Sequence, residues 1–131
     1  MKGIGKSILA LGLTVAMAGA SHAQDLDPTG VWVAEKNSDY SVSWCDADSR
    51  QLCVKLVALR GNMRKKHNLE YLNATIINGA KPSGENRWQG KMKVFGHTGD
   101  AFVTMRGENA LHVKLCAYIV ICDEYDMTRV E

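Results

Sequence analysis

Apolar and polar residues alternate in one segment after another, and this alternation constrains the fold more than any other feature of the chain. The clearest example runs from Arg87 to Phe95, where Trp88, Met92 and Val94 occupy alternate positions between polar or basic residues. A period of two residues places successive side chains on opposite faces of a strand. The pattern therefore predicts an antiparallel, all-β protein.

Turn-forming residues separate eight such segments. The predicted strands cover residues 30–35, 40–45, 52–59, 74–78, 87–95, 101–106, 110–118 and 121–130. Eight antiparallel strands in about a hundred residues suit a small closed barrel, which leaves no exposed sheet edge. A two-sheet sandwich is the alternative. Residues 61–73 break the alternation and are expected to form one short helix or a loop across one end of the sheet. Residues 78–86 are expected to form a turn-rich linker.

The first 23 residues have the features of a secretory signal peptide. Lys2 and Lys6 precede an apolar run, and Ser21, His22 and Ala23 fit a small-x-small cleavage site. The run is shorter than the ~20 residues of a comfortable bilayer span, so an uncleaved anchor is the weaker alternative. Cleavage would leave residues 24–131 as a single barrel domain in the periplasm or secreted.

The charge of that domain argues against nucleic-acid binding. The whole chain has 16 Lys and Arg against 14 Asp and Glu, and loss of Lys2 and Lys6 makes the two totals equal. A neutral domain lacks the basic field that binds phosphate backbones.

Four cysteines lie in the predicted mature domain, namely Cys45, Cys53, Cys116 and Cys122. An even number of cysteines in an exported chain indicates disulfides, although the pairing is open. Each close pair could bridge its own hairpin, or a bond such as Cys45 to Cys116 could join the two segments. The C-x7-C and C-x5-C spacings match neither tetrahedral zinc sites nor a redox C-x-x-C pair.

The two ends of the domain are expected to meet. In an up-and-down barrel the first and last strands are neighbours, so Trp32 and Arg129 can approach each other. A guanidinium over an indole face contributes about 0.5–2 kcal/mol, and the pair would close one end of the barrel. Gly30 leaves room for close backbone approach beside the ring.

Several motifs together resemble the DUF2147 family of small exported bacterial proteins. They are "GVWVAE", "LCVKLVAL", "NRWQGKMKVF", the late cysteine pair and "YDMTRV". The resemblance covers most of the predicted mature chain and implies a lipocalin-like barrel in the cell envelope. The chain departs from the family pattern at Val54, at Met127, where relatives have Trp, and in "RKKHNLEYLN", which replaces an "NPD"-type loop.

No set of residues in the sequence suggests catalysis, a metal site or a cofactor. His67, His97 and His112 lack ligand spacing and are expected on the surface, with His97 in a turn. There is no G-x-S-x-G nucleophile motif. The acidic residues at 123, 124 and 126 and the basic run at 64–67 are interpreted as solvated. We therefore expect a protein that is not an enzyme.

The expected function is binding of a small apolar or amphipathic ligand at the barrel end opposite Trp32, above an otherwise packed interior. The candidate pocket residues are Trp44, Leu56, Met63, Leu69, Leu72, Trp88 and Phe102. One alternative is a protein-binding module, such as a hydrolase inhibitor, that presents residues 96–100 or 82–86. A structural envelope protein is another.

Overall fold

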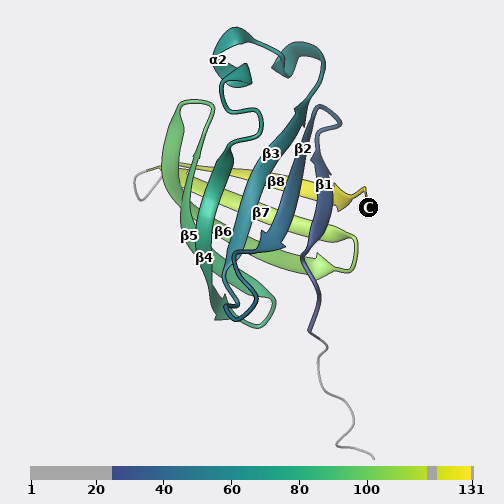
Figure 1. Cartoon of the computed structure of the whole chain (residues 1–131), viewed down its shortest axis with the longest axis vertical. Helices are drawn as coiled ribbons and strands as arrows, with labels where there is room; N and C mark the ends of the chain where they lie inside the picture. The colour runs from purple at the N-terminus through teal and green to yellow at the C-terminus, as the bar shows by residue number, and fades with distance from the viewer. Residues whose placement is uncertain (1–24, 118–120, 131) are drawn as a thin grey trace, which may run out of the picture.

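The computed structural model describes residues 25–117 and 121–130, so the predicted leader lies outside the described part (Figure 1). Eight antiparallel strands form a closed barrel in chain order. This confirms the predicted fold class, and the sandwich alternative was wrong. The strands are β1 (Gly30–Ala34), β2 (Ser38–Trp44), β3 (Leu52–Leu59), β4 (Thr75–Gly84), β5 (Arg87–Val94), β6 (His97–Gly107), β7 (Ala110–Ala117) and β8 (Ile121–Arg129).

Closure depends on the pairing of the first and last strands. β1 pairs with β2 on one side and with β8 on the other, where Trp32 is opposite Arg129 and Ala34 is opposite Met127. β6, β7 and β8 cross behind β1 to β4 (Figure 1). Every strand therefore has two hydrogen-bonded neighbours, and the sheet presents no free edge.

The interior is filled by the inward side chains of all eight strands. Among the largest of these, Trp32, Leu52, Leu56, Ile77 and Val103 have less than 2% of their surface exposed. The void among the central side chains measures only about 10 Å³. A barrel of eight strands is just wide enough for its own side chains, so this packing is the expected outcome for the barrel centre.

A short lid, residues 61–73, covers one end of the barrel. It contains a 3-10 turn, η1 (Gly61–Met63), and a helix, α2 (Lys66–Leu69), which lies above the strands at the top of Figure 1. The buried Asn68 side chain donates from Nδ2 to the Met63 carbonyl at 3.0 Å. The Tyr71 hydroxyl accepts from the Gly96 amide at 3.0 Å, which ties the lid to the turn between β5 and β6. This confirms the predicted connection across one end, and of the two forms expected, a helix or a loop, the segment contains a short helix.

The predicted linker at residues 78–86 was wrong. β4 continues through Gly84, although its pairing with β5 is irregular between Ile77 and Lys81. Gly79 has φ of 92°, a conformation that glycine adopts without steric cost. Glycine and proline in "NGAKPSG" indicated a break, but an irregular pairing lets the strand bend and continue.

Two disulfides brace hairpins at different places in the barrel, which confirms the predicted bonds. Cys45–Cys53 closes the β2–β3 hairpin, and Cys116–Cys122 joins residues directly opposite each other on β7 and β8. The alternative bond from Cys45 to Cys116 was wrong. Two disulfides indicate an oxidising, extracellular type of environment. Among the residues that the structure describes, none of the helices is long and apolar enough to cross a bilayer.

Candidate functional site

The barrel end opposite the lid, here called the floor, is sealed by Trp32. The indole is fully buried and its Nε1 donates to the Pro28 carbonyl at 2.9 Å. The Arg129 guanidinium lies over the ring, with Cζ 4.4 Å from the ring centroid. The same guanidinium donates to three main-chain carbonyls, those of Thr29 at 2.6 Å, Asp27 at 2.8 Å and Glu108 at 2.9 Å. These contacts tie the N-terminal arm and the β6–β7 turn to the last strand.

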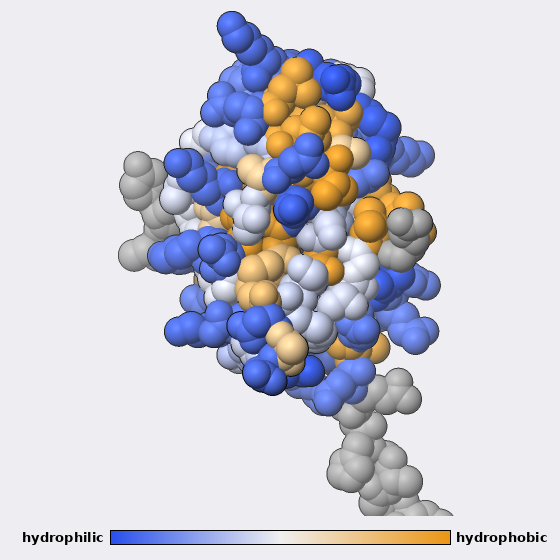
Figure 2. Space-filling view, viewed as in Figure 1, coloured by the Kyte–Doolittle hydropathy of each residue, from blue (hydrophilic) through white to orange (hydrophobic). Residues whose placement is uncertain are grey.

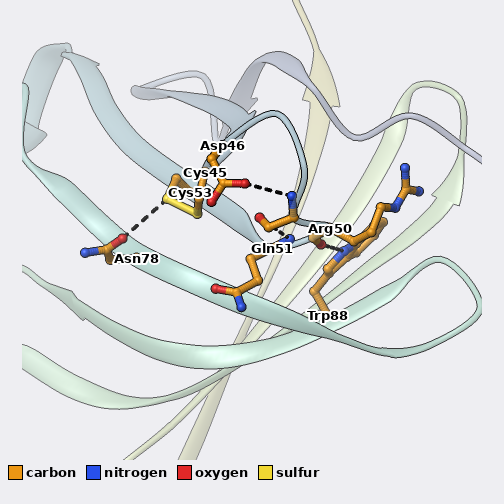
Figure 3. Close-up of a disulfide and its surroundings, with 8 residues drawn as sticks. Cys45, Asp46, Arg50, Gln51, Cys53, Asn78 and Trp88 are labelled. Carbon is orange, nitrogen blue, oxygen red and sulfur yellow. Dashed lines mark hydrogen bonds between the residues drawn. A yellow bond between two sulfur atoms is a disulfide. The ribbon is translucent and has the colours of Figure 1, made fainter.

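A second arginine–tryptophan stack, which sequence reasoning missed, lies at the same end. Arg50 Cζ is 4.5 Å from the centroid of the Trp44 ring, and the Trp44 and Trp88 rings are 6.2 Å apart. Trp88 Nε1 donates to the Arg50 carbonyl at 3.1 Å (Figure 3). Arg50 ends the polar segment "DADSR", whose composition indicated only a solvated turn. The Cys45–Cys53 bond closes this hairpin, and Figure 3 shows it on the same hairpin as Arg50, whose carbonyl lies beside Trp88.

The opposite end contains a cavity of about 250 Å³ beneath the lid. Its walls come from the β1–β2 hairpin, η1 of the lid, the second half of β5 with Phe95, and the inward face of β8. Figure 2 shows apolar side chains at the top of the molecule, where the lid lies, among hydrophilic neighbours. The lining residues are Ala34, Glu35, Asn37, Ser38, Tyr40, Met63, Met92, Val94, Phe95, Tyr125 and Met127.

Most of the cavity lining is apolar and adaptable. Three methionines from different parts of the chain, Met63, Met92 and Met127, contribute flexible and polarisable thioethers. Phe95 packs edge-on against Tyr71 of the lid, with ring centroids 6.0 Å apart. The polar groups of the β1–β2 turn also line the cavity. An apolar cavity with a few polar groups is the usual form of a small-molecule site.

Two phenols in the cavity are held in their neutral form. Burial raises the pKa of Tyr40, and the neighbouring Tyr125 and Glu35 raise it further, against a hydrogen bond involving Ser38 that lowers it. Burial also raises the pKa of Tyr125, with smaller contributions from the carboxylates of Asp123 and Glu35. Both phenols therefore offer the cavity a neutral ring and a hydroxyl that donates or accepts.

The predicted pocket residues lie at different places in the structure rather than around one cavity. Met63 lines the cavity, whereas Leu56 is fully buried in the core and does not. Trp44 and Trp88 lie at the floor, as described above. The tryptophans were expected inside the barrel, but their size did not reveal which end they would occupy.

The remaining three predicted pocket residues also lie outside the cavity. Leu69 and Leu72 are partly buried lid residues that pack against the core. Phe102 is half-buried between Ala101 and Val103, which are both buried, and therefore points to the outer face of β6. Its assignment to the inward face was wrong. Tyr40 and Met92 line the cavity instead, and the alternation of apolar residues in their strands was the signal for the inward face.

The prediction for His112 as a surface residue was wrong. The residue is only 8% exposed, and its Nδ1 lies 2.8 Å from Asp126 Oδ1 while its Nε2 lies 2.8 Å from Glu124 Oε1. The hydrogen bond from His112 is the main cause of a lowered pKa for Asp126, with a further contribution from Arg106. His112 lies directly opposite Asp126 in the pairing of β7 with β8, and no signal in the sequence alone gave this register.

The other predicted histidine positions are exposed. His67 lies in α2, and His97 is the first residue of β6 rather than part of a turn. Within residues 25–117 and 121–130, no three histidine, cysteine or acidic side chains come close enough to hold a metal ion. The geometry of the described residues therefore points to the lid-end cavity as the candidate site.

Comparison of the chain with known protein families, with curated proteins and with solved structures gave no match.

Proposed function

We propose that this is an exported, periplasmic β-barrel protein of the DUF2147 type that binds a small apolar or amphipathic ligand beneath its lid. In this proposal the protein is not an enzyme and needs no cofactor. The observation that carries the proposal is the asymmetry of the barrel. Trp32 and Arg129 seal one end, and the hollow outside that seal, about 380 Å³, is open and lined mainly by polar and charged residues, whereas the other end holds a largely apolar cavity of about 250 Å³.

The size of the cavity limits the ligand. A water-sized group occupies roughly 30 Å³ of liquid volume, so the cavity holds about eight such groups. Drug-sized ligands use pockets of about 300–1,000 Å³, so the proposed ligand is smaller. The packed layer around Leu56 and Val103 stops it from entering further.

The lid gives this ligand a route of entry. η1 and α2 contribute seven residues in two short pieces, and Asn68 is the buried residue of α2. Met63 both belongs to the lid and lines the cavity, so a small movement of η1 would open the site. Short elements with few buried residues are the parts of a fold that open most easily.

Native mass spectrometry tests the proposal first, on protein isolated from its own periplasm without denaturation. We expect a bound small-molecule mass that is lost on denaturation, together with a mass four hydrogens below that of the reduced chain. A mature mass that begins at Gln24 would support the proposed export. A protein that carries a second polypeptide and no small molecule would favour the protein-binding alternative. The two segments suggested for that role, residues 96–100 and 82–86, lie mostly in β6 and at the β4–β5 turn.

A cavity-filling variant provides the direct test. Ala34 is 4% exposed and lines the cavity, so Ala34→Leu places a larger side chain inside it. Ala58→Leu is the matched control, because Ala58 is half-buried on β3 and does not line the cavity. Calorimetric titration with 1-hexanol should show binding to the wild type and to Ala58→Leu, and weaker or no binding to Ala34→Leu. Equal binding by all three proteins would contradict the proposed site.

A further inference from the structure

The charge of the cavity indicates which head group its ligand carries. Glu35 is the one charged side chain among the described lining residues, and neither lysine nor arginine lines the cavity. Glu35 is exposed, so its carboxylate lies on the solvent side of the mouth. An apolar cavity with a carboxylate at its mouth complements a molecule with an apolar body and a cationic end.

The backbone holds Glu35 in an unusual conformation. Glu35 and Lys36 have φ of 47° and 61°, and the Asn37 amide donates to the Ala34 carbonyl at 3.1 Å. Two consecutive residues at positive φ fit a type I′ hairpin turn, which favours Asn-Gly. A non-glycine residue is strained in this region of backbone conformation. The chain therefore keeps a carboxylate at a position where a smaller residue would be less strained.

The field of Glu35 extends into the cavity. Its carboxylate is among the causes that raise the pKa of both Tyr40 and Tyr125, although burial is the larger cause for each. Asp123 acts on Tyr125 in the same direction. Neutral aromatic rings attract cations through their π faces, and Phe95 adds a third ring to the lining.

Two of the nearby basic side chains, Arg60 and Arg64, have hydrogen-bond partners other than Glu35. Arg60 forms hydrogen bonds to the Asp39 carboxylate at 2.7 and 3.0 Å and to the Lys36 carbonyl at 3.1 Å. Arg64 donates to the Leu59 carbonyl at 3.2 Å. Lys36 is exposed and does not line the cavity.

We infer that the ligand is a small organic ammonium ion, with its alkyl part among the methionines and its charged nitrogen at Glu35. This inference rests on the proposed function, because it specifies the ligand of the same cavity. The carboxylate supplies a charge-assisted hydrogen bond, and the neutral rings of Tyr40, Tyr125 and Phe95 belong to the same lining. A carboxylate-bearing ligand of the same length would be repelled at the same position.

The test compares three probes of equal length at pH 7: hexylammonium, 1-hexanol and hexanoate. Calorimetric titration of the wild type should give an affinity for hexylammonium up to about fivefold above that for 1-hexanol, with hexanoate the weakest, since solvent screens an ion pair with an exposed carboxylate. Glu35→Gln should remove the preference for hexylammonium while 1-hexanol still binds. Glu85→Gln is the matched control, because Glu85 is an exposed carboxylate in the β4–β5 turn at the floor. It should keep the wild-type preference.

The outcomes separate the two proposals. If 1-hexanol or hexanoate binds as tightly as hexylammonium, or if Glu35→Gln keeps the preference, the inference about the head group is wrong and the cavity proposal stands. If Glu85→Gln loses the preference as well, the effect comes from general surface charge, and the inference is also wrong. If no probe binds the wild type, both proposals fail.

A second readout does not depend on binding. Ultraviolet titration of the phenols should show that Glu35→Gln moves tyrosine ionisation to lower pH, because removal of the carboxylate lowers the pKa of Tyr40 and Tyr125. The move should be partial, since burial is the larger cause. Tyr40→Phe removes the ionisable hydroxyl of Tyr40 and so identifies its contribution to the titration. An unchanged titration would show that Glu35 does not act on the cavity.

Discussion

Arg129 on β8 lies directly opposite Trp32 on β1 and covers its indole ring at 4.4 Å, so one contact both closes the sheet and seals its floor. The two residues are 97 positions apart, which makes this a long-range contact that fixes the register of barrel closure. The guanidinium also holds main-chain carbonyls of the N-terminal arm and the β6–β7 turn.

Replacement of Arg129 tests this relationship. Arg129→Met removes both the stack and the three hydrogen bonds, and we expect it to lower the free energy of unfolding by about 2–4 kcal/mol. The free energy of unfolding of Arg129→Lys should lie between those of Arg129→Met and the wild type. Lysine keeps the positive charge but lacks the planar guanidinium that donates in several directions. Urea denaturation measures both. Arg106→Lys is the control, since Arg106 is 56% exposed and its nearest acidic partner is 3.7 Å away; an equal loss there would contradict a specific role for Arg129.

The disulfides should stabilise the barrel to similar extents. Replacement of Cys116 and Cys122 by alanine, or of Cys45 and Cys53, should each lower the free energy of unfolding by about 2–3 kcal/mol, because the loops they close are short and of similar length. Urea denaturation under non-reducing conditions measures each variant. The reduced wild type is the control and should lose about the sum of the two effects. A reduced wild type as stable as the oxidised protein would refute the prediction.

The decrease in the free energy of unfolding at low pH should depend on Asp126. Its pKa is lowered in the folded state, mainly by the hydrogen bond from His112. A lowered pKa contributes stability that is complete above the unfolded value of about 3.8 and is lost as the pH falls through the folded value. Asp126→Asn should therefore be less stable than the wild type at pH 6, and the difference should narrow below about pH 4.

A double-mutant cycle with His112→Gln isolates this pair. In the His112→Gln background, Asp126→Asn should lose most of its pH-dependent effect, because the main cause of the lowered pKa is absent. Urea denaturation between pH 2 and pH 7 measures all four proteins. An effect of Asp126→Asn that stays the same in both backgrounds would show that Arg106 or another group is the partner.

Two glycines on β6 should respond differently to the same substitution. A Cβ added at Gly99 would lie 2.2 Å from the Cys116 carbonyl oxygen, whereas one at Gly107 would have its nearest neighbour, Ala110 Cβ, at 4.0 Å. Gly99→Ala must move the backbone of β7 and should cost about 1–3 kcal/mol. Gly107→Ala should be close to neutral. Thermal unfolding of both variants tests this prediction. Equal melting temperatures would show that β6 and β7 move apart at Gly99 at no cost in stability.

Much of the fold could be predicted because its signals are local or lie at the two ends of the chain. Alternation in segments such as Arg87 to Phe95 predicted strands, since a two-residue period follows from strand geometry alone. The number of strands then favoured closure, and closure brought Trp32 and Arg129 together. The even count of cysteines predicted disulfides from the chemistry of an oxidising compartment.

Other features were decided only by tertiary structure. The orientation of Phe102 is not one of them, because alternation within β6 already places it on the same face as Thr104 and Arg106, away from Ala101 and Val103. His112 is enclosed because β8 places Glu124 and Asp126 beside both of its ring nitrogens. The enclosure of His112 depends on the register between β7 and β8. A shift of one residue would turn the side chains of β8 to the opposite face, and alternation within a strand does not specify the register between strands.

The sequence by itself therefore determined the all-β class, most of the strands and the two ends that meet, and it favoured a closed barrel over a sandwich. Tertiary structure decided where the interior is filled and where it is hollow. Trp44 and Trp88 were expected to line a pocket but lie at the floor, while Met63, Met92 and Met127 from distant parts of the chain surround the cavity. A cavity is the volume that side chains from many strands leave unfilled, so it follows from their joint packing rather than from any local pattern.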